Sequence, residues 1–314
     1  MARPDLDHAP ALRGALAEAK GIAETMPDML VEARRVANTV LAGWHGRRAS
    51  GRGETFWQFR PFVSGEAAAS IDWRRSARDE HLFVRETEWE AAHTLWLWPD
   101  LSASMDFRSR LAKVSKRQRA IVLTLALADL LAGAGERVGI PGIGKPVLAR
   151  DAAERLALTL AAAPVASASA GGGTRGPDTR LVRRLHDIIL FSDFLDPVAE
   201  TDALLERILK SGARAHLVQI VDPIEETFPY AGRTEFVDPE TGLRHLATRA
   251  ELYREEYQAR LAALREHLRA GNRRAGWTFL VHRTDRPATE PLLALHARLA
   301  DRHHGHAAYA GHAA

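Results

Sequence analysis

Apolar and polar positions alternate in blocks from residue 93 to the last part of the chain. Short runs of apolar residues that end in polar turns predict buried strands, and apolar residues spaced three or four apart predict helices. Strands alternating with helices indicate an α/β fold, with a doubly wound, mainly parallel sheet and helices on both faces. Strands are expected at 93–100, 187–194, 213–223 and 277–282, two short strands at 136–150, and helices at 111–134, 151–163, 198–211, 249–270 and 288–303.

The chain before residue 91 has a different pattern. Residues 11–45 have helical spacing of apolar positions, and Pro27 divides them into two helices or one kinked helix. Residues 56–62 and 81–90 have the composition and alternation of short strands. We therefore expect N-terminal helices and a β-rich segment at 1–90, the α/β domain at 91–303, and a disordered tail at 304–314.

The cysteine content and the charge balance of the chain exclude or disfavour several classes of protein. The 314 residues contain no cysteine, which excludes a disulfide framework, a thiolate zinc site and a cysteine nucleophile. Lys plus Arg number 43 against 40 Asp plus Glu, and the two signs are interspersed apart from a basic cluster at Arg47, Arg48 and Arg52. This balance does not indicate a nucleic-acid-binding protein.

No targeting or membrane segment is recognisable. The first residues include acidic side chains and lack the apolar stretch of a signal peptide. The longest apolar window, 121–134, is interrupted by Asp129 and is shorter than a membrane span of roughly 20 residues. We expect a cytoplasmic protein.

Oxygen-rich turns follow two of the expected strands. Asp100, Ser102 and Ser104 lie in the turn after the first, and Ser192 and Asp193 lie after the strand at 187–194. In a doubly wound sheet, ligands bind outside the carboxyl ends of the strands. A further hydroxyl, Thr174, lies in a glycine-rich loop.

These side chains offer carboxylate and hydroxyl oxygens, which suit Mg²⁺ and, with looser geometry, Mn²⁺ or Ca²⁺. Few of the donors are charged, so the ion keeps net positive charge. It can then accept a carboxylate from another molecule as its last ligand. The predicted metal ligands are Asp100, Ser102, Ser104, Thr174 and Asp193.

The order of several motifs resembles a known bacterial family. The motifs are GRGETF (51–56), FVSGEAAASIDWRRSAR (62–78), VRETEWE (84–90), DLSASM (100–105), SDFLDP (192–197), VDPIEETFP (221–229) and VDPETG (237–242). Together they resemble the domain of unknown function 58 family. The DLSASM turn, Thr174 and Ser192-Asp193 resemble the metal-ion-dependent adhesion site of von Willebrand factor A domains.

The resemblance implies a von Willebrand factor A-like fold and an association with AAA+ ATPases of the MoxR type. It implies an adaptor-like or chaperone-like role in protein maturation, and no chemical activity. One motif departs from the family pattern, because Gly65 is followed by Glu66 and alanines where an acidic pair is usual.

Each candidate functional residue or segment also has an interpretation in which its role is purely structural. The DxSxS residues could cap the next helix, and Asp193 could cap the helix at 198. The segment 72–78 is interpreted as structural, with Trp73 packed and its arginines paired, in preference to a recognition patch. The C-terminal His303, His304 and His306 are interpreted as part of a solvated tail. The charged helix at 249–270 is an exposed face or a docking site.

Three function classes remain. The first is a metal-dependent module that binds an acidic residue of a protein partner. The second is a Mg²⁺-dependent hydrolase or phosphotransferase at the same site, whose nearest candidate bases, Asp106 and Asp196, have no evident activation. The third is a nucleic-acid binder that uses 47–78, which the weak net charge disfavours.

Overall fold

The computed structural model describes residues 9–45, 56–63, 71–79, 81–87, 93–162 and 176–310. The chain forms two compact units, one of Met1–Ala42 with Thr94–Ala314 and one of Gly43–His93. Helix α1 (Ala9–His45) therefore belongs for most of its length to the larger unit, whereas the sequence pattern had grouped it with the β-rich segment. Pro27 lies inside α1, which is one continuous helix.

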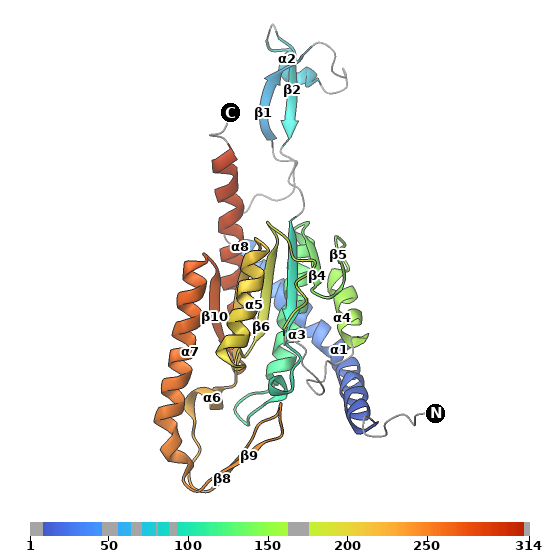
Figure 1. The fold of residues 1–314 in the computed structure, drawn as a ribbon. Coiled ribbons are helices and arrows are strands. Elements are labelled where there is room, and N and C mark those ends of the chain that lie inside the picture. The colour runs from blue at the N-terminus through green and yellow to red at the C-terminus, as the bar shows by residue number, and fades with distance from the viewer. Residues whose placement is uncertain are drawn as a thin grey trace, which may run out of the picture. The chain divides into compact units, whose positions relative to one another are not determined.

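A six-stranded sheet organises the larger unit (Figure 1). Its spatial order is β10-β7-β6-β3-β4-β5, and every neighbouring pair is parallel except β4 with β5. The expected mixed α/β class with a mainly parallel sheet is confirmed. The strands are β3 (Thr94–Pro99), β4 (Arg137–Ile140), β5 (Ile143–Val147), β6 (Asp187–Ser192), β7 (Arg214–Val221) and β10 (Thr278–Arg283).

The direction in which the chain adds strands to the sheet reverses between β3 and β6. From β3 the chain moves outward to β4 and β5, and from β6 it moves outward in the opposite direction to β7 and β10. The loops after β3 and β6 therefore diverge to opposite sides of the sheet. This is the arrangement in which Rossmann-like sheets bind ligands at the carboxyl ends of their central strands.

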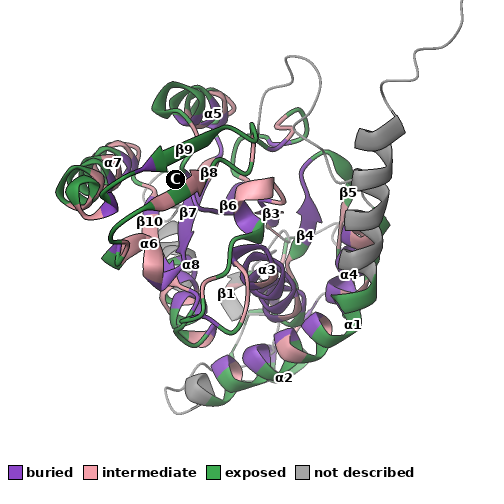
Figure 2. Ribbon diagram, turned by 90° about the horizontal axis from the view of Figure 1, so that it is seen from below, coloured by how far each residue is buried: buried purple, intermediate pink, exposed green. Residues whose placement is uncertain are grey.

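Helices cover both faces of the sheet, as Figures 1 and 2 show. Leu95 and Leu97 of β3 point into a core with α1, α3, α4 and α8, and Trp96 between them points into a second core with α5 and α7. This period of two is what a strand buried on both faces requires. The helices are α3 (Lys116–Gly133), α4 (Ala152–Ala162), α5 (Val198–Lys210), α7 (Arg254–Arg274) and α8 (Thr289–Ala310).

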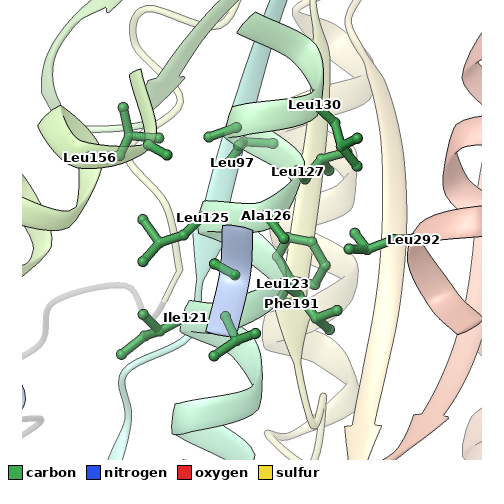
Figure 3. Packing of buried hydrophobic residues seen from close by; sticks show 14 of the residues in the cluster. Leu97, Ile121, Leu123, Leu125, Ala126, Leu127, Leu130, Leu156, Phe191 and Leu292 are labelled. Carbon is green, nitrogen blue, oxygen red and sulfur yellow. The ribbon is translucent and has the colours of Figure 1, made fainter. Parts of the chain in front are cut away.

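Helix α3 is buried on nearly every side (Figure 3). Its apolar side chains contact Leu97 and Phe191 of the sheet, Leu156 of α4 and Leu292 of α8 within one cluster. The described part of α1 adds Met29 and Val36 to that cluster from the outer side. A helix that is apolar all round is stable only where it is enclosed in this way.

Short elements at the carboxyl edge complete the larger unit. The 3₁₀ turn η3 (Ala103–Asp106) follows β3, and α6 (Pro223–Thr227) follows β7. An antiparallel hairpin is formed by β8 (Thr234–Val237) and β9 (Arg244–Ala247), and η4 (Ala250–Tyr253) follows it. Helix α8 runs to Ala310, into the segment that low complexity had marked as a disordered tail, because its alanines favour helix.

The smaller unit contains an antiparallel pair and one helical turn: β1 (Phe56–Pro61), β2 (Phe83–Thr87) and α2 (Trp73–Ser76). Asp72 caps α2, and the Arg75 guanidinium lies 4.9 Å from the Phe83 ring centre and 3.7 Å from Asp79. These contacts agree with a structural role for this segment. Trp73, expected to pack, is 61% exposed.

Within the described part of the chain, no helix combines the length and hydrophobicity that a membrane crossing requires.

Candidate metal centre

The turns after β3 and β6 lie side by side at the carboxyl edge of the sheet. The two strands pair in parallel up to Pro99 and Phe191, and the backbone N–H of Asp100 donates to the Phe191 carbonyl at 2.8 Å. This register brings Asp100 next to Ser192, 92 residues later in the sequence. The proximity expected from the two strand ends is therefore present.

Asp100 is a buried carboxylate with polar neighbours. The Ser192 hydroxyl donates to its Oδ2 at 2.6 Å, and the backbone N–H of Ser102 donates to its Oδ1 at 2.9 Å. Its side chain is 5% exposed, and it forms no ion pair with any residue that the structure describes. Burial raises the pKa of Asp100 to about 6 against the opposing Ser192 and Ser102 hydrogen bonds, and the Asp193 charge adds to the rise.

The DxSxS turn gathers hydroxyls beside this carboxylate. The Oγ atoms of Ser102 and Ser104 are 3.2 Å apart and in hydrogen-bond contact. The buried guanidinium of Arg117 stabilises the turn, because it donates to the carbonyls of Leu101 at 2.8 Å and Ser102 at 3.1 Å. The side chains of Ser102 and Ser104 cap no helix here, since η3 has no side-chain cap at Ser102.

Asp193 lies beside Asp100 and has a cationic partner of its own. The ammonium of Lys116, which is 1% exposed, donates to Asp193 Oδ2 at 2.8 Å and to Glu225 Oε1 at 2.6 Å. The second Asp193 oxygen accepts the Leu195 N–H at 3.2 Å. The structure thus brings the predicted ligand Asp193 to the site and pairs it with Lys116.

One ammonium, that of Lys116, pairs with two carboxylates, the buried Asp193 and the partly buried Glu225. Burial alone would lower the pKa of Lys116, but the charges of Asp193 and Glu225 raise it, so this lysine is protonated. Burial raises the pKa of Glu225, and the shared lysine offsets that rise only in part. Asp100, Asp193 and Glu225 bring three carboxyl groups near the one ammonium of Lys116. When all four groups are ionised, these four side chains have a net negative charge.

Two further acidic residues shape the edge. Asp222 caps α6 in a capping box with Glu225, and its Oδ2 accepts the backbone N–H of Ser109 at 2.9 Å. This bond holds the loop 107–115 over the sheet edge. Glu240, from the loop between β8 and β9, accepts the backbone N–H of Ser104 at 2.8 Å.

The predicted ligands divide into three groups. Asp100, Ser102 and Ser104 lie together with Ser192, and they offer the carboxylate and hydroxyl oxygens that a hard cation takes. Asp193 lies adjacent. Thr174 lies outside the described residues. Among the residues described, no three His, Cys, Asp or Glu side chains are grouped so that they alone could hold an ion.

Sequence reasoning missed Lys116, Glu225 and Glu240 as residues of the site. Lys116 belongs to a basic first turn, KRQR, that precedes a mostly apolar helix, and nothing in the sequence distinguishes it from Arg117 and Arg119. Glu225 and Glu240 lie in two acidic motifs, DPIEE and DPETG, whose spacing carries no information about what they contact. Only the folded chain shows that they reach the same edge.

Fold and site together define a mixed α/β protein with a cluster of carboxylate and hydroxyl side chains at the carboxyl edge of a Rossmann-like sheet. Residues 58–267 match the family described as "Protein of unknown function DUF58", and the chain belongs to this family.

Relatives of similar length are found in mycobacteria. The uncharacterized proteins Rv1480 of Mycobacterium tuberculosis and Mb1516 of Mycobacterium bovis are each 26% identical over 298 residues, covering 90% of this chain and 91% of their own. Their names indicate no enzymatic activity. The conserved hypothetical protein BatB from Bacteroides thetaiotaomicron aligns over 67% of this chain and 100% of its own, with 13% identity and a TM-score of 0.37. That score supports no inference.

Proposed function

We propose that this chain is a metal-dependent protein-binding module with a von Willebrand factor A-like fold. It acts as an adaptor-like or chaperone-like partner of a MoxR-type AAA+ ATPase and binds an acidic residue of its partner through a divalent cation. Mg²⁺ is the first candidate, with Mn²⁺ and Ca²⁺ as alternatives. Asp100, Ser102 and Ser104 would hold the ion, with Asp193 and Thr174 as the other proposed ligands.

The observation that carries this proposal is the state of Asp100. It is buried and has no ion pair among the described residues, and it accepts from the Ser192 hydroxyl. The side chain of Ser102 also interacts with it, and the Ser104 hydroxyl contacts that of Ser102. A buried carboxylate without a compensating charge is costly. A hard cation would supply that charge and take the neighbouring hydroxyls as ligands.

The sheet topology supports the proposal. The donors follow the two central strands at the reversal point, and an antiparallel strand, β5, closes one edge of an otherwise parallel sheet. Lys116 already offsets the charge of Asp193, so Asp100 is the proposed ligand whose negative charge is not compensated by a described residue, and an ion held here keeps positive charge. It can therefore attract a carboxylate from outside.

The surface next to the turn is suited to an acidic partner. The loop 107–113 exposes Arg108, Arg110 and Lys113 around Leu111, whose side chain is also exposed. Basic residues on the rim of an interface speed association with an acidic partner, and an apolar residue among them adds buried area. The partner segment that this surface fits is acidic with an apolar anchor.

The first test is ion binding by the full-length protein. Mn²⁺ binding, followed by electron paramagnetic resonance, should be lost in Asp100→Ala because the charged ligand is removed. Asp202→Asn is the matched control, since this carboxylate is half exposed on α5 and pairs with His267 at 2.8 Å. Equal Mn²⁺ affinity in wild type and Asp100→Ala would refute the metal site.

The second test concerns the partner. The purified MoxR-type ATPase of the same organism should be retained on immobilised wild-type protein in Mg²⁺ and released by EDTA. Asp100→Ala should not retain it, and Asp202→Asn should. Retention that is indifferent to both EDTA and Asp100→Ala would contradict a cation-bridged complex.

A Mg²⁺-dependent hydrolase or phosphotransferase would use the same oxygen donors. No particular observation favours it, since the candidate base Asp106 forms an ion pair with Arg117 at 2.9 Å.

A further inference from the structure

The loop between β8 and β9 brings a carboxylate to the DxSxS turn. Glu240 Oε1 accepts the backbone N–H of Ser104 at 2.8 Å, across 136 residues of sequence. Ser104 is in turn in hydrogen-bond contact with Ser102 through its hydroxyl. In Figure 1 the hairpin extends beyond α6 and α7 and its tip returns toward the loop that precedes α3.

The loop that carries Glu240 is ordered by its own hydrogen bonds. The Asp238 carboxylate accepts the Glu240 N–H at 2.9 Å and also accepts from the Thr241 hydroxyl. The Gly242 N–H donates to the Asp238 carbonyl at 2.8 Å, and Gly242 has φ 71°, a conformation that favours glycine. These hydrogen bonds hold the backbone of the tip in one conformation, and this conformation places Glu240 beside the DxSxS turn.

Aromatic contacts anchor the hairpin through β8, on the strand that leads into the tip. The Phe236 ring stacks on Phe228 at 5.8 Å and meets Tyr230 edge-on at 5.2 Å, and Phe228 also contacts Tyr257 of α7. Nearer the tip, Leu243 is 71% exposed. Strand β8 is thus held by aromatic packing, and Glu240 links the tip to the turn through the Ser104 N–H.

We propose that Glu240 is a ligand residue of the same cation site, supplied by the chain itself, and that it occupies the place of the partner's carboxylate. An acidic partner residue then binds in exchange for Glu240, with the hairpin tip moving off the turn. This inference rests on the proposed function, because it takes the cation site at Asp100, Ser102 and Ser104 as given.

A purely structural role for Glu240 makes a different prediction. Acceptance of the Ser104 N–H requires only a carbonyl-type oxygen, which the amide of glutamine also has. A ligand to a cation needs the carboxylate charge. Glu240→Gln therefore keeps an oxygen that can accept the Ser104 N–H and removes the carboxylate charge that the proposal requires.

The experiment uses the full-length protein with two probes, Mn²⁺ alone and a fluorescent hexaglutamate peptide. Glu240→Gln should bind Mn²⁺ more weakly than wild type, because one anionic ligand is lost. The Mn²⁺-saturated variant should bind hexaglutamate more tightly than wild type. A tip closed in about nine of ten molecules predicts about a tenfold gain in apparent affinity when it is released.

The matched control is Glu235→Gln on the same hairpin. Glu235 is exposed and pairs with Arg244 across the two strands at 3.4 Å, so its loss changes the net charge of the hairpin equally. It should alter neither affinity. Hydrogen exchange at residues 238–243 gives a second readout, and it should rise when hexaglutamate binds to the wild-type protein in Mn²⁺.

The outcomes separate this inference from the proposed function. If Asp100→Ala binds Mn²⁺ as wild type does, the cation site fails and this inference fails with it. If Asp100→Ala loses Mn²⁺ but Glu240→Gln behaves as Glu235→Gln in both affinities, the site stands and the role of Glu240 is refuted. Weaker Mn²⁺ binding with tighter hexaglutamate binding in Glu240→Gln supports the exchange.

Discussion

Asp100 is buried without a counter-charge among the described residues, and this predicts how the stability of the protein depends on pH. Its pKa is raised from 3.8 to about 6, so the folded protein favours the protonated form and loses stability as the pH rises through that range. At pH 7 the cost approaches about 3 kcal/mol. Without divalent cations, Asp100→Asn should therefore unfold at a higher temperature than wild type at pH 7.

The same pair of proteins should respond oppositely to the cation. Excess Mg²⁺ should raise the melting temperature of wild type, since an ion that binds only the folded state stabilises it. It should leave Asp100→Asn unchanged. A variant less stable than wild type in EDTA at pH 7, measured by calorimetry, would contradict the unpaired charge at Asp100.

His282 on β10 predicts a loss of stability in acid. Burial lowers its pKa to about 3, the charge of Arg119 adds to the effect, and Asp285 opposes it. The unfolded imidazole takes up a proton below about pH 6.5 while the folded one does not, so stability falls as the pH drops from that value.

Between pH 7 and pH 5 this group should cost about 2 kcal/mol of unfolding free energy. His282→Phe removes the titrating group and fills a similar space, so its denaturant-unfolding curves should lose less stability over the same interval. Identical pH dependence in wild type and His282→Phe would show that another group is responsible.

At the scale of elements, the two faces of α1 should differ in how much stability is lost when a charged residue is introduced. Val40 is 1% exposed within the core that α1 shares with α3, whereas Val31 on the same helix is 69% exposed. Val40→Asp buries a carboxylate among apolar side chains and should cost about 3 kcal/mol or more. Val31→Asp should change stability by less than about 0.5 kcal/mol.

Urea unfolding of the two variants provides the measurement. Both substitutions change helix propensity by the same amount, so their difference isolates the burial of position 40. Equal effects would mean that α1 does not cover α3 in solution.

At the scale of the whole molecule, the division into two units predicts that the larger unit folds without the smaller one. Among the residues that the structure describes, both hydrophobic clusters consist of residues of the larger unit and include none of Gly43–His93. Replacing residues 46–91 by a flexible Gly-Ser linker should therefore leave the larger unit folded. Its unfolding free energy should change by less than about 1 kcal/mol, since separate cores contribute separately.

Circular dichroism and Mn²⁺ binding of this linked variant test the prediction together. Retained helix content and retained Mn²⁺ affinity are expected, because Asp100, Ser102 and Ser104 lie in the larger unit. Aggregation or loss of cooperative unfolding would show that the smaller unit is needed for the core.

The sequence alone determined the class of fold and the ends of its central strands. Buried strands such as β3 and β6 are short apolar runs that end in polar residues, and this local pattern also placed Asp100 and Ser192 at one edge of the sheet. Such features follow from periodicity and turn chemistry, which act over a few residues.

Tertiary structure alone decided how the charges at that edge are paired. Lys116 meets Asp193 across 77 residues and Glu225 across 109, and Glu240 meets Ser104 across 136. These partners depend on the strand order and on the direction in which each loop leaves the sheet, and no local spacing records either. The same reason explains why Asp100 lacks a cationic partner among the described residues while Asp193, beside it, has one.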